Sequence, residues 1–373
     1  MRLSVTSSYG YGMAQIFSSA LARLLIDGAL PLLDSRLAAS TTPYTGSPAM
    51  IPHVESRARS MVHYGIFVPK LPEPYRYLNT MTLIGSTGTE IFDNDALVAP
   101  DARNTTTVLS TTAADDQYFY RAYDAATDCD FAADGSHLRW GGELTIDVAE
   151  SRAHILGRYP DFSVELTSTI TDQVSYFIRT PIYDHLSLLA PFEGTITDAD
   201  GTTPVSGLGT FEYAHAITPQ ALTGRPFPGP LKLPADFFTY QIIELDERTQ
   251  LLLTCVSVRG AVACLLVHIR VLGESTRVLD EVTFEVGEYA DDLVDEWGRP
   301  MRMPAHMRWI ARQDGREVLR LDAVPDSTWR FGHGRGYVGA YSYAGRFLDD
   351  DVTGSGYIEW VDTQRNPRRS WGR

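Results

Sequence analysis

The sequence has few cysteines and none in a recognisable pattern. Cys129, Cys255 and Cys264 are the three cysteines in 373 residues, and none has the C-x-x-C spacing of a zinc or redox site. The odd number argues against a disulfide framework and favours a reducing compartment, so we interpret the protein as cytoplasmic. Cys255 and Cys264 lie in apolar runs, where a cysteine is typically a small buried hydrophobe.

Basic residues are also scarce. Lys and Arg total 32 against 47 Asp and Glu, which gives a net charge of -15. Such a field repels phosphate backbones and anionic headgroups, so we expect no nucleic-acid partner. The C-terminal segment 364–373 is a local basic exception, and we interpret it as a solvated tail rather than a binding arm.

No apolar run is long enough to cross a membrane. The stretch from Met13 to Leu33 is interrupted by Arg23, Asp27 and Pro31, so we expect no integral membrane association. Leucines at positions 21, 24, 25 and 30 are spaced for an amphipathic helix. We expect this helix to pack on the protein or a partner, with a membrane-surface helix as the alternative.

The usual local motifs of metal and nucleophile chemistry are absent. The nine histidines form no H-x-H or H-E-x-x-H pattern, so we expect no metal. There is no G-x-S-x-G elbow for a serine nucleophile. We interpret Asp349–Asp351 as a solvated turn and Gly332–Gly336 as a long hairpin loop.

What the sequence does contain is a repeated phrase. Gly207–Tyr213 reads GLGTFEY and Gly354–Trp360 reads GSGYIEW. Each copy follows another glycine, Gly194 or Gly345, and an acidic turn. A separation of about 150 residues indicates two similar domains rather than a short-period solenoid. We interpret each copy as a closing strand in which the Glu and the following aromatic residue point to opposite faces.

Short alternating strands dominate from about residue 60 onward. They are rich in β-branched and aromatic residues and are separated by turn signals, which is typical of an antiparallel sandwich or barrel. A proline-rich connector at 219–234 divides them. The predicted organisation is a helical segment at 1–55, β domains at 56–218 and 235–363 on either side of the connector, and a basic tail at 364–373.

With these motifs, the chain resembles the carotenoid 1,2-hydratase (hydroxyneurosporene synthase) superfamily. Its relatives include tocopherol cyclases, kievitone hydratase and lipocalin-type Diels–Alderases. The sequence has His63-Tyr64-Gly65 where that group has Trp-Trp-Tyr. The resemblance implies an all-β fold of two tandem lipocalin-like barrels. It also implies a large apolar cavity that handles a hydrophobic molecule without a cofactor or metal.

Alkene hydration or cyclisation needs an acid that protonates carbon and a base, both in a dry pocket. The candidate catalytic residues are Asp184, His185, His268 and Tyr64. Asp184 and His185 stand before an apolar run, and His268 shares a strand face with Arg270. Tyr64 has the parity of an inward residue and could equally be a core tyrosine, whereas His63 points the other way and is predicted to be a surface residue.

Aromatic walls suit a cationic intermediate through cation–π attraction. We expect substrate contacts from Tyr240, Glu244, Tyr183 and Trp140. Tyr240 and Glu244 share one face of a strand, and burial of that Glu would raise its pKa as a general acid requires.

The resemblance, together with these polar residues in apolar strands, implies a cofactor-independent lyase or isomerase, either a hydratase or a cyclase. Its expected partner is a hydrophobic isoprenoid, polyketide or steroid-like molecule. A non-catalytic carrier of a hydrophobic ligand is the alternative, and a structural protein without a cavity is a third hypothesis. A homodimer is compatible with all three.

Overall fold

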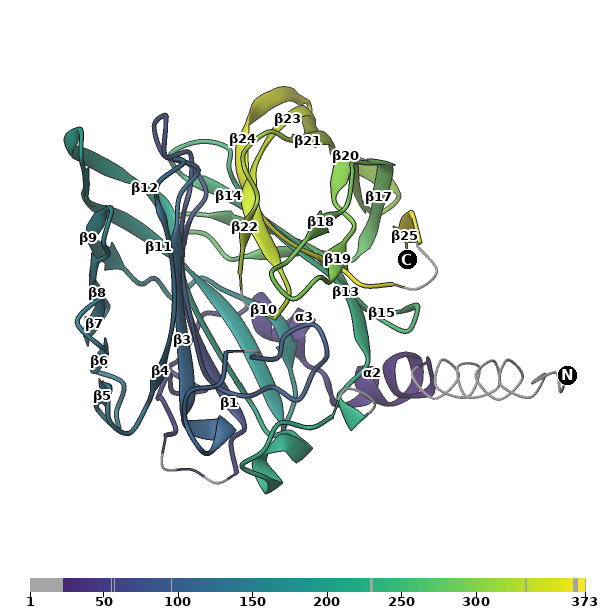
Figure 1. Cartoon of the computed structure of the whole chain (residues 1–373). Helices are drawn as coiled ribbons and strands as arrows, with labels where there is room; N and C mark the ends of the chain where they lie inside the picture. The colour runs from purple at the N-terminus through teal and green to yellow at the C-terminus, as the bar shows by residue number, and fades with distance from the viewer. Residues whose placement is uncertain are drawn as a thin grey trace, which may run out of the picture.

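The molecule consists almost entirely of two large antiparallel sheets, each strongly curved (Figure 1). The computed structural model describes residues 23–54, 56, 58–94, 96–228, 231–332, 334–364 and 368–372. One sheet lies before the proline-rich connector and the other after it. The predicted all-β fold of two tandem lipocalin-like barrels is confirmed.

The N-terminal sheet has the strand order β4-β3-β2-β1-β12-β11-β9-β8-β7-β6-β5, with β10 paired to β11. Its strands are β1 (Met61–Val68), β2 (Leu78–Gly85), β3 (Thr105–Thr111), β4 (Tyr118–Asp124), β5 (Cys129–Phe131), β6 (His137–Trp140), β7 (Leu144–Ala149), β8 (Arg152–Arg158), β9 (Ser163–Thr169), β10 (Val174–Arg179), β11 (Tyr183–Asp198) and β12 (Gly201–Ala216).

The C-terminal sheet has the order β16-β15-β14-β13-β24-β23-β21-β20-β17-β25, with β22 paired to β23 and a separate β18-β19 ribbon. Its strands are β13 (Ala235–Glu244), β14 (Thr249–Val258), β15 (Ala261–Val271), β16 (Arg277–Leu279), β17 (Glu281–Tyr289), β18 (Leu293–Val294), β19 (Pro300–Met301), β20 (Pro304–Gln313), β21 (Arg316–Pro325), β22 (Arg330–Phe331), β23 (Tyr337–Phe347), β24 (Asp350–Asp362) and β25 (Ser370–Gly372).

The two sheets share one connectivity around the repeated phrase. In each half the first strand pairs with both its successor and the strand that carries the phrase: β1 with β2 and β12, and β13 with β14 and β24. The preceding glycines match as well. A Cβ added to Gly194 would lie 2.0 Å from the carbonyl oxygen of Glu165, and one added to Gly345 would lie 1.9 Å from that of Arg320. Both glycines therefore let a neighbouring strand cross at the same point of each sheet.

The inward face of each sheet is filled with side chains. Tyr64, Trp140 and Tyr213 lie in the N-terminal core. Trp309, Trp360 and Trp371 lie in the C-terminal core. The alternation of the repeated phrase places Tyr213 and Trp360 in these cores, as the period of two requires.

The N-terminal helical segment contacts both sheets. It comprises the π-helix η1 (Leu24–Ala29), α2 (Leu30–Leu33) and α3 (Arg36–Ser40). The Ser35 amide donates to the carbonyl of Arg179 in β10 at 3.0 Å, and the Arg36 guanidinium donates to the carbonyl of Ala263 in β15 at 3.0 Å. Figure 1 shows α2 and α3 beside these strands.

Of the leucines predicted to pack, Leu24 is 68% exposed and Leu30 is half-buried. The prediction is therefore wrong for Leu24. Leu21 lies outside the described residues. Among the described residues, none of the helices combines the length and the apolar character that spanning a bilayer requires.

Two short 3₁₀ helices, η2 (Ala102–Asn104) and η3 (Pro219–Leu222), lie in connections, the second at the start of the proline-rich stretch. Gln220 of η3 is fully buried, and its side-chain amide donates to the carbonyl of Arg225 at 2.7 Å. This bond links η3 to the residues that follow it.

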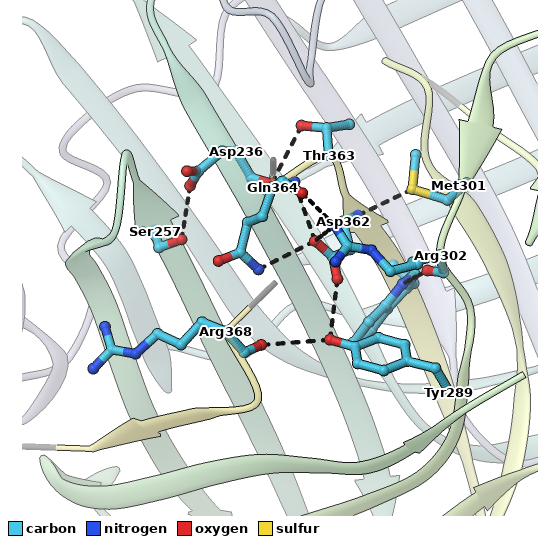
Figure 2. A network of polar contacts seen from close by, with 10 residues as sticks. Asp236, Ser257, Tyr289, Met301, Arg302, Asp362, Thr363, Gln364 and Arg368 are labelled. Atoms are coloured by element: carbon cyan, nitrogen blue, oxygen red, sulfur yellow. Dashed lines mark hydrogen bonds and ion pairs between the residues drawn. The ribbon is translucent and has the colours of Figure 1, made fainter. Parts of the chain in front are cut away.

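The end of the chain returns to the second barrel, so the expectation of a solvated tail is wrong for residues 368–372. Strand β25 pairs with β17, and Trp371 is fully buried against Phe237 with 4.2 Å between ring centroids. Figure 2 shows the polar network that precedes this strand. The buried Asp362 carboxylate accepts from Tyr289 at 3.2 Å and from Arg302 at 3.3 Å. Burial of the large Trp371 side chain outweighs the solvation of the nearby Arg368 and Arg369.

Replacement of Trp371 by Ala should lower the free energy of unfolding by about 3–5 kcal/mol, because it removes a buried indole that closes the second core. Urea unfolding followed by circular dichroism measures the change. The matched control is Trp297→Ala, because that indole is 46% exposed and should change stability by less than about 1 kcal/mol. Equal effects of the two variants would contradict the assignment of Trp371 as a core residue.

Candidate functional site

The two barrels meet through a shared cluster of aromatic and aliphatic side chains. Both domains contribute to it: Phe67, Tyr77, Met81, Leu109 and Phe177 come from the first, and Tyr240, Ile242, Leu252, Val338, Ala340 and Tyr357 from the second. Within this apolar surface lies a group of buried polar residues. Their charges act strongly on one another because water is largely excluded.

Glu212 is at the centre of the polar group. It occupies the Glu position of the first repeat, and because Tyr213 points into the barrel, Glu212 points toward the second domain. It is only 1% exposed. Tyr240 of β13 donates its hydroxyl hydrogen to Oε1 of Glu212, and Nε2 of His185 lies 3.5 Å from Oε2. A buried carboxyl is thus held by groups from both barrels.

His63 and His185 face each other beside Glu212, with 5.7 Å between ring centroids. Nδ1 of His63 lies 2.8 Å from the carbonyl oxygen of Thr82. Burial, together with the neighbouring His185, lowers the pKa of His63 to about 4, so the ring is neutral at pH 7. Gly65 permits this arrangement, since a Cβ there would lie 3.0 Å from Nε2 of His63.

Arg270 supplies a buried positive charge on the β15 side of the site. Its guanidinium donates to the carbonyl and hydroxyl oxygens of Ser187 at 3.1 and 3.2 Å, and also to Gln250. Burial lowers the pKa of Arg270 to about 10, while the charges of Tyr240 and Glu212 oppose that change. The guanidinium therefore remains charged at neutral pH.

Glu359 is the second acidic group, in the matching position of the second repeat. It pairs in register with Tyr240 across β13 and β24, and the Tyr357 hydroxyl donates to its Oε1 at 3.0 Å. Burial and the charge of Glu212 raise the pKa of Glu359 to about 8, against the bond from Tyr357. The side chain is only partly buried by its accessible surface. At pH 7 this carboxyl is therefore protonated and within reach of a neighbouring molecule.

Phe177 of β10 connects the histidines. Its ring centroid lies 4.7 Å from that of His185, 5.0 Å from that of Tyr240 and 6.0 Å from that of His268. His268 is fully buried, and burial with the charge of Arg270 lowers its pKa to about 3. A neutral His268 can accept or donate a hydrogen bond but does not carry charge.

Three of the predicted site residues come together here: His185, His268 and Tyr240. Asp184 does not join them, because it lies on the opposite face of β11 from His185, where its Oδ2 is 3.4 Å from Nε2 of His215. Tyr183 is half-buried and stacks on His185 with 6.3 Å between centroids. Burial raises the pKa of Tyr183 to about 12.

Tyr64 and Trp140 belong to the N-terminal core instead. The Tyr64 hydroxyl donates to the carbonyl of Met50 at 3.0 Å, and the Trp140 indole donates to the Thr106 hydroxyl at 2.9 Å. Both polar atoms are satisfied by the protein itself, as is usual for core aromatic residues.

Glu244 lies further along β13, away from the polar group. Its Oε2 accepts from the amide of Leu208 at 2.9 Å, and Lys70 lies 3.5 Å from Oε1. Burial raises its pKa, against the bond from the Leu208 amide and the nearby Lys70. Through the bond to the Leu208 amide, Glu244 links the Gly207–Gly209 segment of the first repeat to the second barrel.

The sequence interpretation missed His63, Glu212 and Glu359. His63 does point out of its barrel, but it is only 8% exposed because the second barrel covers it. The prediction of a surface histidine is therefore wrong. The signal for the two carboxyls was present, since the same Glu recurs in both halves of the chain.

Clusters of buried side chains lie in the interiors of both barrels, and the large apolar cavity that the resemblance implies stays a prediction. One hollow of about 400 Å³ does open at an end of the inter-barrel seam. It is lined by Thr171, Asp172, Gln173, Arg248, Leu272 and Gly273. Gln250 and Arg270, which pair with each other across β14 and β15, lie two residues along the chain from Arg248 and Leu272 of this lining. A larger hollow, of about 740 Å³, lies away from it around Glu193 and Pro204.

Comparison with known proteins supports the fold. A family model described as "Family of unknown function (DUF6670)" matches residues 81–372. No curated protein matches the chain.

Three solved structures are similar at low sequence identity. A protein from Nitrosomonas europaea described as AttH has a TM-score of 0.59 at 12% identity, covering 87% of this chain and 100% of its own. Kievitone hydratase from Nectria haematococca has a TM-score of 0.52 at 12% identity, with 87% and 96% covered. CghA with Sch210972 has a TM-score of 0.51 at 11% identity, with 83% and 90% covered. The shared architecture is the tandem lipocalin-like one, and the closer resemblance to carotenoid hydratases stays a prediction.

Replacement of Tyr240 by Phe should destabilise the protein by about 1–3 kcal/mol, because it leaves an oxygen of a buried carboxyl without its donor. Chemical unfolding measures the loss. Tyr118→Phe is the matched control, since Tyr118 is 37% exposed. A stability unchanged in Tyr240→Phe would contradict the role of this bond.

The free energy of unfolding of the wild-type protein should fall, relative to that of the Glu359→Gln variant, as the pH rises from about 5 to about 8. The folded pKa of Glu359 is about 8 and its ordinary value is 4.5, so in this window the unfolded chain loses a proton that the folded chain keeps. The stabilisation that the protonated Glu359 provides is complete below the ordinary pKa of 4.5. It disappears as the pH rises through the folded pKa of about 8. Unfolding free energies at several pH values test this, with the exposed Glu288→Gln as control. Parallel profiles for wild type and Glu359→Gln would show that the pKa is not raised.

Proposed function

We propose that this chain, which belongs to the family of unknown function DUF6670, is an acid–base lyase or isomerase. It would be a hydratase or a cyclase that acts on a hydrophobic substrate between its two barrels. The observation that carries the proposal is the placement of the two repeat carboxyls. Glu212 is held by Tyr240 and His185, and Glu359 lies beside Tyr240 with a raised pKa. A protonated carboxyl beside a second carboxyl that is held by hydrogen-bond donors can serve as the acid and the base of one reaction.

The charges of the site support this division of roles. Arg270 is the buried cation whose field stabilises a charged Glu212, and the charge of Glu212 in turn favours a protonated Glu359. Glu359 is the proton donor because it is both protonated and partly accessible. Glu212 is the acceptor, with Tyr240 and His185 able to relay a proton to it.

In a hydration, Glu359 would give its proton to one carbon of a double bond. Water would add to the cation formed at the other carbon, and the proton that this water loses would pass to Glu212. In a cyclisation the internal nucleophile replaces water and the proton balance is the same. The aromatic rings of Phe67, Phe177 and Tyr357 would surround such a cation and stabilise it.

The apolar surface between the barrels supports a hydrophobic substrate of isoprenoid, polyketide or steroid-like type. Two structures of the same architecture support this direction, since one is a hydratase by name and the other was solved with Sch210972. The filled barrel interiors do not favour a carrier that encloses its ligand inside a barrel.

A deuterium-incorporation screen would test the proposal. The protein would be incubated in D₂O with a panel of prenylated phenols, polyenes and linear polyketides, and products would be analysed by mass spectrometry. A turned-over substrate should gain one deuterium on carbon. Glu359→Gln and Glu212→Gln should each slow turnover about 100-fold or more, because each removes one proton-transfer group.

The rate should also fall above about pH 8, where Glu359 loses its proton. Glu288→Gln, a change at an exposed carboxyl of β17, is the control and should keep the wild-type rate. If Glu359→Gln and Glu212→Gln both turn over an accepted substrate at the wild-type rate, the proposed acid and base are wrong.

A further inference from the structure

The side chains of His63, His185 and Glu212 form a compact group of nitrogen and oxygen donors. One donor atom from each lies within 4.8 Å of the other two, and among the described residues this is the group with that property. The three residues come from β1, β11 and β12, which are adjacent in the first sheet. Their separation along the chain explains why local motifs gave no sign of a metal site.

The hydrogen bonds around the group orient its donor atoms inward. Nδ1 of His63 faces the carbonyl oxygen of Thr82, which can only accept, so Nδ1 carries the hydrogen and Nε2 carries the lone pair. Oε1 of Glu212 is occupied by the Tyr240 hydroxyl, which leaves Oε2 toward His185. Metal-binding histidines and carboxylates are typically fixed by such outer bonds.

A glycine lets two rings pack closely beside the group. A Cβ at Gly65 would lie 2.4 Å from the Phe67 ring and 3.0 Å from Nε2 of His63. Nε2 of His185 is buried and makes no hydrogen bond among the described residues, although Oε2 of Glu212 lies 3.5 Å away as an ion-pair partner. A buried nitrogen without a hydrogen bond costs free energy unless a ligand engages it.

We propose that His63, His185 and Glu212 form a binding site for a divalent transition-metal ion of the Zn²⁺ class. Two imidazoles and one carboxylate are the donors that such ions favour, and three protein ligands leave a coordination position open. Bonds of about 2.0–2.2 Å place neighbouring ligand atoms about 3.4 Å apart, so the group must contract by about 1 Å. Rotation of the His185 ring, which is the most exposed of the three side chains, supplies that movement.

The site goes beyond the proposed function, which needs only the two carboxyls. A bound ion would draw Glu212 into its coordination and would lower the pKa of a bound water to about 7. The water on the ion, rather than Glu212, would then be the base of the proposed reaction, and Glu359 would remain the acid.

Isothermal titration of the full chain, stripped with EDTA, with ZnCl₂ would test the site. We expect one ion per chain with a dissociation constant at or below micromolar. Co²⁺ as a spectroscopic probe should give the visible bands of a low-coordinate N/O site. His63→Ala, His185→Ala and Glu212→Gln should each weaken Zn²⁺ binding at least 100-fold.

The matched control is His306→Ala, which removes a surface histidine 3.2 Å from Asp322 and should leave binding unchanged. Because His63 is buried, His63→Gln serves as a second variant whose folding is checked by thermal unfolding. Absence of binding to the wild type, or binding that all three site variants keep, would overturn the proposal.

The outcomes separate this proposal from the proposed function. Zn²⁺ binding with a fully active Glu359→Gln would overturn the acid–base function and leave the metal site. An inactive Glu359→Gln in a protein that binds no Zn²⁺ would do the reverse.

Discussion

The central constraint in this molecule is a carboxyl group buried between two domains. Glu212 is 1% exposed, and a charge removed from water must be compensated by nearby donors and charges. Its own barrel supplies His185, and the other barrel supplies Tyr240 and the field of Arg270. The two barrels are therefore coupled by electrostatics as well as by apolar contact. Burial and, after it, the same charge of Glu212 raise the pKa of Glu359.

The internal repeat shows how one strand pattern can yield two different groups. Glu212 and Glu359 occupy the same place in their sheets, yet they differ in what the neighbouring first strand presents to them. Gly65 is paired with Glu212, whereas Tyr240 is paired with Glu359. The glycine leaves room for the rings of Phe67 and His63, and the tyrosine reaches across to the other carboxyl. The two halves of the site therefore differ at this paired position.

The strands and the repeat could be predicted from the sequence because both depend on local alternation. His268 and Arg270 could be grouped for the same reason, as they share one face of a strand. The site as a whole could not, because its residues come from β1, β11, β12, β13, β15 and β24 of two domains. The alternation along a strand predicts that His63 points out of its barrel, but it does not predict what lies on that side. The second barrel covers His63 there. Trp371 lies in a basic segment, and the charge of that segment led us to expect that it is solvated. Burial of the Trp371 indole determines the position of the segment instead.

The helix α3 segment crosses the seam, with the Ser35 amide on β10 of one barrel and the Arg36 guanidinium on β15 of the other. The barrels therefore cannot rock apart as rigid bodies while both bonds persist. Separation of the barrels at this point would have to break both bonds, and they belong to two consecutive residues at the start of a five-residue helix.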